Sequence, residues 1–382
     1  MKISIWLATL ATLAGGPALA QNAYIPKVYS NNVAVVDTQT NAVIGTIPVG
    51  NEPVGVAVTP NGGTVYITNY QSGTISAIDT ATNSVIATIT GLGDPFGIAV
   101  SPDGSTVYTA DATRNNVAVI DTATNSLVAT IPVGPSPIGI AVSPDGRTVY
   151  VTGGGGDVIP GTFSVIDTAT RAVVMTIAVG TNPTGVAVSP DGRTVYVANS
   201  TSSSGSTSSS VSVIDAATNH YQVIATIPVS GYPFGIVLTP DGTKAYVSKA
   251  LAGAVAVIDT ATNTVTETIS VPDNNPAGIA LTPDARSLYV AGENGDASVV
   301  NTTTNSVTDT ITIGGVPVAF GIFIQPPPLA PQFAGTPGAS NCRGQSVSAL
   351  AQKYGGLPTA AEDLGYSSVQ VLQNAINVYC AG

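Results

Sequence analysis

Residues 119–125 read Val-Ile-Asp-Thr-Ala-Thr-Asn, and close copies of this phrase recur along the chain. The apolar part of each copy ends in an acid or an amide, at Asp37, Asp79, Asp121, Asp167, Asp215, Asp259 and Asn301. The successive spacings of 42, 42, 46, 48, 44 and 42 residues match the length of one four-stranded unit of a repeat fold. The chain of 382 residues is therefore predicted to contain seven similar units.

Each unit can be divided into four short strands. In the third copy, 138–143 and 148–151 are joined by the turn Pro144-Asp145-Gly146, and 117–121 and 127–131 are strands of the other two types. β-Branched residues alternate with small or polar ones, and Pro, Asp, Asn and Gly stand at the joints, as short antiparallel strands require. The pattern predicts an all-β protein, a seven-bladed β-propeller with four-stranded blades.

Several of these strands share a recognisable phrase. Tyr66-Ile67-Thr68-Asn69 and Tyr196-Val197-Ala198-Asn199, together with Tyr150-Val151-Thr152, resemble the tetrapeptide after which the YVTN β-propeller repeats are named. The resemblance covers about residues 23–325. Proteins of that kind include surface-layer proteins, lactonase-like enzymes, a lyase and domains of redox enzymes, so the resemblance implies a fold rather than one activity.

The two ends of the repeat array complement each other. The last copy stops after Ala319–Ile324, without its turn and second strand, while Ala23–Tyr29 supplies that missing strand before the first copy. We therefore expect three N-terminal strands and one C-terminal inner strand to share a blade. This 3+1 closure would remove two exposed sheet edges.

Residues 1–20 have the features of a secretory signal peptide. Lys2 precedes the apolar run Ile3–Ala14, and Ala18-Leu19-Ala20 forms a small-residue cleavage site before Gln21. An uncleaved anchor is the alternative. No other stretch reaches the roughly 20 apolar residues of a spanning helix. The mature chain is predicted to be extracytoplasmic, either periplasmic or secreted, with no transmembrane segment.

The charge balance disfavours a nucleic-acid partner. The chain has 11 basic and 22 acidic residues, and removal of Lys2 with the signal peptide leaves a net charge of −12. The basic residues are scattered over the repeats rather than clustered. Such a surface repels phosphate groups, so no nucleic-acid binding is expected.

Propeller function usually lies on the face whose loops differ between blades. Two kinds of loop share that face. One kind connects the outermost strand of a blade to the innermost strand of the next blade, and the other connects the two middle strands of a blade. The second kind includes the long insertions 153–161 and 200–210. Three Phe residues beside acidic and aromatic residues would form a pocket with an apolar floor and an acidic rim. Alternatively, the Phe side chains pack between blades. The candidate ligand-binding residues are Glu52, Asp94, Phe96, Asp111, Arg114, Asn182, Tyr232, Phe234, Asn275 and Phe320.

The repeated acids are predicted to be structural. An Asp followed by Thr-x-Thr-Asn forms a turn in which the carboxylate accepts hydrogen bonds from nearby backbone N–H groups. The Pro-Asp-Gly turns are interpreted in the same way. The one imidazole, His220, is expected in an exposed turn on the opposite face, which disfavours a Ser-His-Asp triad. A Ca²⁺ site built from Glu52, Asp94 and Asp111 is the metal-binding alternative.

The C-terminal tail differs from the repeats. A Pro- and Gly-rich linker, 326–340, precedes a small helical module, 341–382, whose first helix is expected from Ser346 to Gly355. Cys342 and Cys380, the only cysteines, are predicted to form a disulfide, with free thiols or a metal pair as alternatives. The module would either dock on the propeller as a cap or attach it to a cell envelope or partner.

The sequence thus predicts a signal peptide in residues 1–20, a propeller in 21–325 and the tail described above. The predicted function is a monomeric, non-catalytic scaffold that binds an unidentified protein, glycan or small ligand through the variable-loop face. No catalytic residue and no cofactor other than the alternative Ca²⁺ is predicted. The rival hypothesis is a lactonase-like or lyase-like propeller enzyme that depends on a divalent cation.

Overall fold

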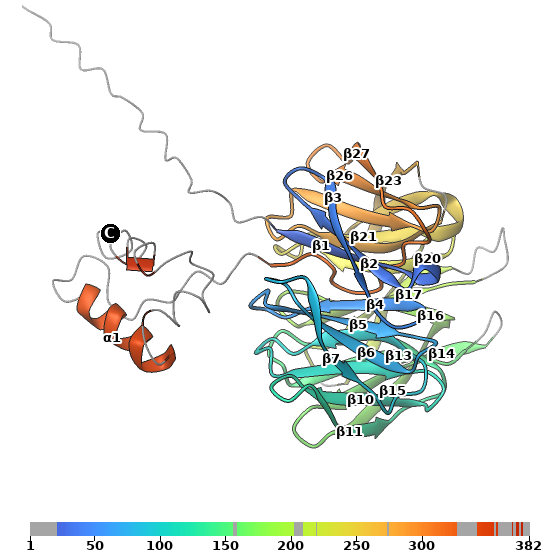
Figure 1. Cartoon of the computed structure of the whole chain (residues 1–382). Coiled ribbons are helices and arrows are strands. Elements are labelled where there is room, and N and C mark those ends of the chain that lie inside the picture. Colours follow the sequence, from blue (N-terminus) through green and yellow to red (C-terminus); the bar gives the residue numbers. More distant parts are fainter. Residues whose placement is uncertain are drawn as a thin grey trace, which may run out of the picture.

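The computed structural model is a wheel of small β-sheets, which Figure 1 shows from the side. It describes residues 21–155, 159–201, 209–218, 220–272, 275–326 and 342–354, with residues 357, 369, 372, 373 and 376. The predicted signal peptide and Cys380 lie outside these residues. The chain is a seven-bladed propeller with four-stranded blades, as predicted.

The blades follow one another in chain order, blades 2 to 7 each run from their inner to their outer strand, and two short 3₁₀ helices connect neighbouring strands. Blade 1 contains β1 (Asn22–Lys27), β2 (Asn32–Asp37) and β3 (Ala42–Pro48), with η1 (Val28–Ser30) between the first two. Blade 2 contains β4 (Pro53–Val58), β5 (Thr64–Asn69), β6 (Thr74–Asp79) and β7 (Ser84–Ile89). Blade 3 contains β8 (Pro95–Val100), β9 (Thr106–Asp111), β10 (Asn116–Asp121) and β11 (Ser126–Pro132). Blade 4 contains β12 (Pro137–Val142), β13 (Thr148–Gly153), β14 (Pro160–Asp167) and β15 (Ala172–Thr181). Blade 5 contains β16 (Pro183–Val188), β17 (Thr194–Asn199), β18 (Ser210–Asp215) and β19 (Gln222–Pro228). Blade 6 contains β20 (Pro233–Leu238), β21 (Lys244–Lys249), η2 (Ala250–Ala252), β22 (Ala254–Asp259) and β23 (Thr264–Ser270). Blade 7 contains β24 (Pro276–Leu281), β25 (Ser287–Gly292), β26 (Asp296–Asn301) and β27 (Ser306–Thr312).

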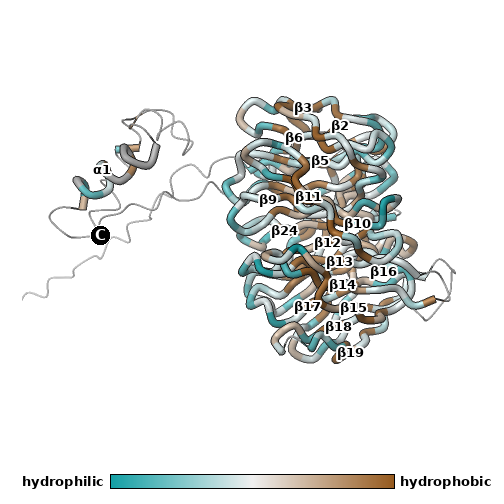
Figure 2. The backbone as a smooth tube through the Cα atoms, turned by 90° about the horizontal axis from the view of Figure 1, so that it is seen from below, coloured by the Kyte–Doolittle hydropathy of each residue, from teal (hydrophilic) through white to brown (hydrophobic). Residues whose placement is uncertain are grey.

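The core lies between neighbouring blades. The two middle strands of each blade are buried along their centres, because both faces of each sheet pack against another blade. β-Branched side chains and Ala fill these layers, and the turns at both ends of the strands are polar. Figure 2 shows this distribution, with hydrophobic residues along the strands.

The outer strands carry a bulge at the same position of every blade. In blade 2, Val85 pairs with Ile78 and Ala87 pairs with Ala77, so Ile86 has no partner and is exposed. Equivalent register shifts occur in the six other outer pairs. A bulge bends an edge strand and hinders pairing with another sheet, which protects the rim of the wheel.

A segment at the end of the propeller lies between the first and second blades. We call residues 316–326 the closing segment. The Tyr24 N–H donates to Phe323 O at 2.8 Å and the Gln325 N–H donates to Asn22 O at 2.8 Å, so this segment runs antiparallel to β1. On its other side, Val56 N–H donates to Phe320 O at 3.1 Å. These contacts form isolated bridges rather than a continuous strand, and they support the 3+1 closure, which stays a prediction.

Buried tyrosines connect successive blades. In blade 2 the Tyr66 hydroxyl donates to Asn125 Oδ1 of blade 3 at 2.8 Å. The same contact joins Tyr24 to Asn83 at 2.8 Å and Tyr289 to Asn41 at 2.5 Å. Each of these Asn residues has a positive φ, an αL turn position that Asn tolerates well. The repeated Tyr and the repeated Asn therefore form one interblade hydrogen bond.

The repeated acids cap their own turns. The Asp121 carboxylate accepts hydrogen bonds from the Thr124 N–H at 2.8 Å and the Thr124 hydroxyl at 2.7 Å, which lowers its pKa. In the other turn type, Asp145 accepts from the Ser143 hydroxyl at 2.6 Å and the Arg147 N–H at 3.1 Å. The prediction of a structural role for both sets is confirmed.

The tail contains the helix α1 (Cys342–Tyr354). It begins before the predicted start at Ser346 and ends just before Gly355, as expected. Cys342 and Leu350 are buried, as are Leu372 and Ile376 further along the tail. Cys342 is not a free thiol, but the Cys342–Cys380 disulfide stays a prediction because Cys380 is outside the described residues.

Candidate functional site

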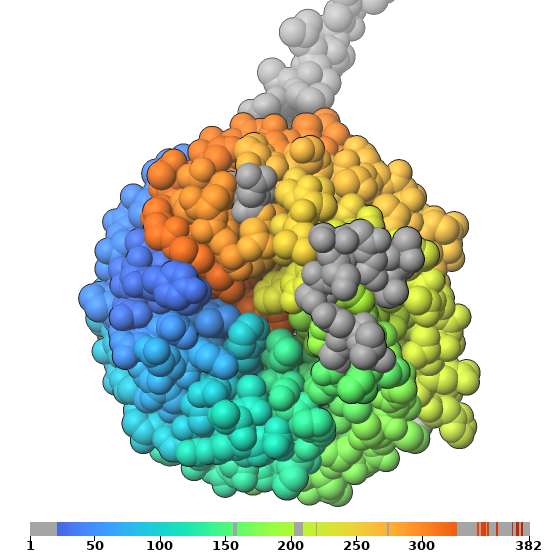
Figure 3. Space-filling model, turned by 90° about the vertical axis from the view of Figure 1, so that its right-hand side faces the viewer, coloured from blue at the N-terminus to red at the C-terminus, as the bar shows by residue number. Residues whose placement is uncertain are grey.

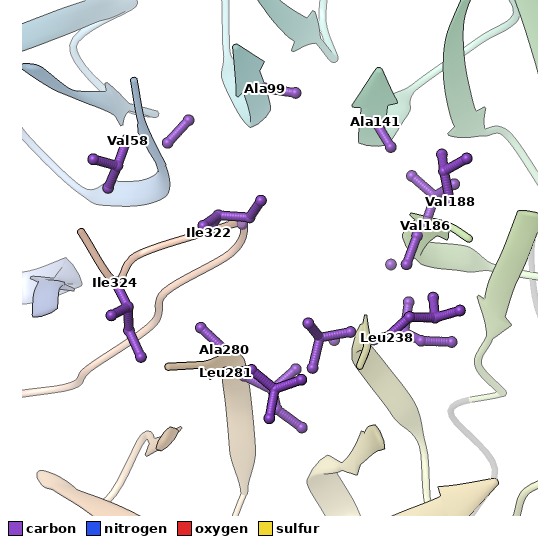
Figure 4. A pocket seen from close by; sticks show the side chains of 18 of the residues that line it. Val58, Ala99, Ala141, Val186, Val188, Leu238, Ala280, Leu281, Ile322 and Ile324 are labelled. Carbon is purple, nitrogen blue, oxygen red and sulfur yellow. The ribbon is translucent and has the colours of Figure 1, made fainter. Parts of the chain in front are cut away.

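A cavity of about 540 Å³ occupies one half of the central channel. Its walls are the C-terminal halves of the inner strands β4, β8, β12, β16, β20 and β24, together with the closing segment (Figure 4). At its rim lie prolines of the turns that follow these strands, such as Pro60, Pro144 and Pro240. The cavity is therefore on the side of the wheel that carries the Pro-Asp-Gly turns.

The cavity walls are aliphatic. The same position of six blades contributes Val58, Val100, Val142, Val188, Leu238 and Leu281. The described lining residues include no Asp, Glu, His, Lys or Arg. The hydroxyls of Thr239 and Thr282, at the rim, donate to Asp241 and Asp284 of their own turns. The site has the volume of a small-molecule pocket and the chemistry of an apolar one.

Three phenylalanines pack together beside this cavity, and one of them, Phe320, also lines it. The rings of Phe96 and Phe234 each lie 5.3 Å from that of Phe320, with interplanar angles of 68° and 67°. Such edge-to-face pairs contribute about 0.5–1.5 kcal/mol each beyond their burial. They pack with Val54 and Ala277, so the predicted cluster exists. Figure 3 shows that the variable-loop face is hollowed at its centre.

Four predicted residues share one position around the variable-loop face. Glu52, Asn182, Tyr232 and Asn275 each precede the proline that starts an inner strand, and their φ angles are 52°, 41°, 62° and 79°. At Glu52 and Tyr232 this αL conformation carries strain of about 1–3 kcal/mol, whereas Asn tolerates it well. Asn275 also donates a side-chain hydrogen bond to Glu293, whose pKa is raised by burial. Glu293 was not among the predicted residues.

The other predicted polar residues form a local structural group. Asp111 is buried, and its carboxylate accepts from the Gly93 N–H at 2.7 Å, the Asp94 N–H at 3.2 Å and the Arg114 N–H at 3.3 Å. The Arg114 guanidinium donates to Gly91 O. These contacts hold two loops together. Asp111 takes the position that Asn69 and Asn199 occupy in other blades, which explains its burial.

Acidic groups gather beside one aromatic residue of this face. Burial raises the pKa of Tyr70, and the nearby carboxylates of Asp94 and Glu52 raise it further. The Tyr70 ring stacks edge-on against Phe96, with the centroids 6.1 Å apart. Among the described residues, no three His, Cys, Asp or Glu side chains are grouped as a metal site would require. His220 is exposed, as expected.

Sequence reasoning did not find the aliphatic cavity. The signal is present in the repeated inner-strand pattern Gly-Ile-Ala-Val, at 97–100 and 139–142, which alternates large and small apolar residues. From the sequence, this pattern predicts only a strand. Because the inner strands surround an open channel, part of their apolar surface faces that channel instead.

Comparison with known proteins supports the fold and its repeat type. A model of YNCE-like β-propellers matches residues 4–119. The chain is a YVTN-type β-propeller repeat protein. A second model, of the SMP-30/gluconolactonase/LRE-like region, matches residues 153–293 of this propeller. No curated protein matches the chain.

Solved structures resemble this YVTN-type propeller in fold. Hydrazine synthase of Kuenenia stuttgartiensis superposes with a TM-score of 0.68 at 24% identity, covering 73% of this chain and 92% of that one. A functionally unknown protein of Desulfotomaculum acetoxidans gives 0.65 at 18%, covering 78% and 99%. The dihydro-heme d1 dehydrogenase NirN, in complex with DHE, gives a TM-score of 0.58 at 18% identity, covering 81% of this chain and 77% of that one.

None of the helices in the described part of the chain has the length and apolarity that a bilayer crossing requires.

Proposed function

We propose that this propeller is a non-catalytic binding protein that holds an apolar small molecule in its central cavity. The observation that carries the proposal is the aliphatic cavity of about 540 Å³, which Phe320 lines and beside which Phe96 and Phe234 pack on Phe320. Pockets of 300–1,000 Å³ typically bury most of a small ligand. Export and a monomeric state are part of the same proposal.

The physical basis is the removal of apolar surface from water. Each Å² of apolar surface that becomes buried contributes about 25 cal/mol. A ligand in this cavity would cover the aliphatic side chains of several blades at once. Because the described walls offer no ionisable group, the binding energy would come from apolar contact, and specificity from size and shape.

The location differs from the one expected from the sequence. The pocket expected from the sequence lies on the variable-loop face, with the phenylalanines, whose rings pack against one another, as its apolar floor. Asp111 and Arg114 are engaged in loop contacts. We therefore place the ligand on the opposite side of the Phe cluster. The variable loops remain available as a surface for a protein or glycan partner.

Binding can be tested with the neutral apolar dye Nile red, added to the mature chain and followed by its fluorescence. Wild-type protein should bind the dye saturably. Ala141→Phe places a ring in the cavity and should weaken binding at least tenfold without lowering the melting temperature. Ala123→Phe, in an exposed turn, is the matched control and should bind like wild type. Absence of saturable binding by wild-type protein would reject the proposal.

The rival function, a lactonase-like enzyme dependent on a divalent cation, is favoured by one observation. The gluconolactonase-like model matches residues 153–293. The candidate metal ligands Glu52 and Asp94 both lie close to Tyr70. Lactone hydrolysis should be assayed with added Ca²⁺, Mg²⁺ or Zn²⁺ and with a chelator. Metal-dependent turnover that Glu52→Gln and Asp94→Asn abolish would establish the enzyme and replace the first proposal.

A further inference from the structure

Ile322 occupies an unusual position among the residues that surround the channel. The closing segment repeats the Phe-Gly-Ile sequence of β8 and β20, so Ile322 corresponds to Ile98 and Ile236. Those two side chains are 3% and 9% exposed, because they pack between blades. Ile322 is 66% exposed. Figure 4 shows its side chain directed from the closing segment toward the open centre of the cavity.

The sequence of the closing segment explains this orientation. Two additional residues, Val318 and Ala319, separate Pro317 from Phe320, whereas in β8 and β20 the corresponding proline and Phe are adjacent. Ala319 packs against Gly278. In other blades the equivalent glycine packs against an inner-strand residue of the next blade. Gly321 then adopts a φ of +130°, and a Cβ at this position would collide with Val56 O. This backbone conformation turns Ile322 into the channel.

We propose that Ile322 is the main ligand contact of the cavity and sets the size of the apolar molecule that the cavity accepts. This inference rests on the proposed function. A largely exposed Ile surrounded by aliphatic walls loses its contact with water only when a ligand covers it, and this burial favours binding. Because the side chain protrudes into the cavity, it also limits the length of ligand that fits. Truncation to Ala removes contact for short ligands and creates room for longer ones.

The ligand would also stabilise the closing segment. Ile322 and Ile324 both line the cavity, and the backbone between them accepts the hydrogen bond from the Tyr24 N–H. A ligand that binds only the closed arrangement stabilises it by mass action. Hydrogen exchange of the Tyr24 and Gln325 amides should therefore slow when ligand is present. The amide of Ile75, in a buried middle strand away from the cavity, provides the reference.

The experiment uses the mature full chain and 1-alkanols from hexanol to dodecanol, which compete with Nile red. We expect Ile322→Ala to weaken hexanol binding about tenfold and to shift the preferred chain length upward. Ile322→Leu should retain wild-type preference. Ile86→Ala is the matched control, because Ile86 is 55% exposed on the outer strand β7, and its affinities should equal those of wild type.

The outcomes separate this inference from the proposed function. If Ile322→Ala and wild type bind all alkanols equally, the role of Ile322 is rejected and the apolar site stands. If affinity falls equally for every chain length, the size-setting role is rejected. If wild type binds neither dye nor alkanol, the proposed function itself fails. Unchanged exchange at Tyr24 and Gln325 in the bound protein would reject the link to the closing segment.

Discussion

Replacing Tyr66 by Phe tests whether the repeated tyrosines hold the blades together. Tyr66 is 2% exposed, and its hydroxyl donates to Asn125 Oδ1 of the next blade at 2.8 Å. The substitution keeps the ring and removes this hydrogen bond. Asn125 is only half-buried, so its oxygen can turn to water, and we expect a loss of about 1 kcal/mol in the free energy of unfolding.

A double-mutant cycle separates the hydrogen bond from other effects. Asn125 has a φ of 49°, which Gly also adopts readily, so Asn125→Gly removes the acceptor without adding backbone strain. Each single variant should be destabilised by about 1 kcal/mol, and the double variant by little more than either one, which gives a coupling of about 1 kcal/mol. Guanidinium unfolding followed by far-ultraviolet circular dichroism provides the free energies.

The chain contains a matched control for this experiment. Tyr196 is the equivalent tyrosine of blade 5, but Asn263 Oδ1 in the next blade has no hydrogen-bond partner among the described residues. Tyr196→Phe should therefore change stability by less than about 0.5 kcal/mol. The reasoning would be refuted if Tyr196→Phe cost as much as Tyr66→Phe, or if the effects in the cycle were additive.

Further predictions concern a loop, a glycine, the closing segment and pH. Asp111→Ala should lower the free energy of unfolding by about 2–3 kcal/mol, because three backbone N–H groups lose their acceptor, while Asp111→Asn should cost less; denaturant titration of both variants checks this. Gly321→Ala should lower the free energy of unfolding by more than about 2 kcal/mol, because its Cβ would collide with Val56 O. Gly314→Ala should cost only about 1 kcal/mol, because Gly314 has a φ of 73° but open space around it. Equal losses of stability in thermal melts of the two variants would contradict the collision with Val56. A chain ending at Pro326 should keep the unfolding midpoint of the full propeller, and one ending at Gly315 should unfold at lower denaturant concentration, because it lacks the contacts to β1 and β4. Burial raises the pKa values of Tyr24, Tyr66 and Tyr289 to about 12. Because a folded-state pKa of about 12 exceeds the unfolded value of about 10, the contribution of these tyrosines to the free energy of unfolding is complete below pH 10 and is lost as pH rises toward 12. The urea midpoint should fall over that pH window, together with the rise in tyrosinate absorbance.

Much of the fold could be predicted from local sequence. The hydrogen bonds of Asp121 and Asp145 reach residues only two or three positions away, so the turn phrases contain both donor and acceptor. Strand alternation is equally local, and the repeat period converts it into seven blades. The order of the strands also predicts that Glu52 and Asn182 stand in equivalent loops, and both have a positive φ before the proline that starts an inner strand.

The candidate site depended on contacts between blades, which the repeat pattern does not describe. The sequence shows that three Phe residues recur beside the inner strands, but only the structure shows that Phe96 and Phe234 pack on Phe320. The sequence pattern favours Asp111 as a rim carboxylate, whereas the structure buries it against Gly93.

The sequence by itself determined the number of blades, their strands and their turn chemistry, because these depend on interactions within a few residues of one another. Only the tertiary structure decided which apolar residues line the channel and which are buried. Ile98 and Ile322 stand in the same local phrase and both line the cavity, yet Ile98 is 3% exposed because it packs between blades, whereas Ile322 is 66% exposed. The difference arises because closing the ring joins the two ends of the repeat array, and Val318, Ala319 and Gly321 alter the backbone at that junction.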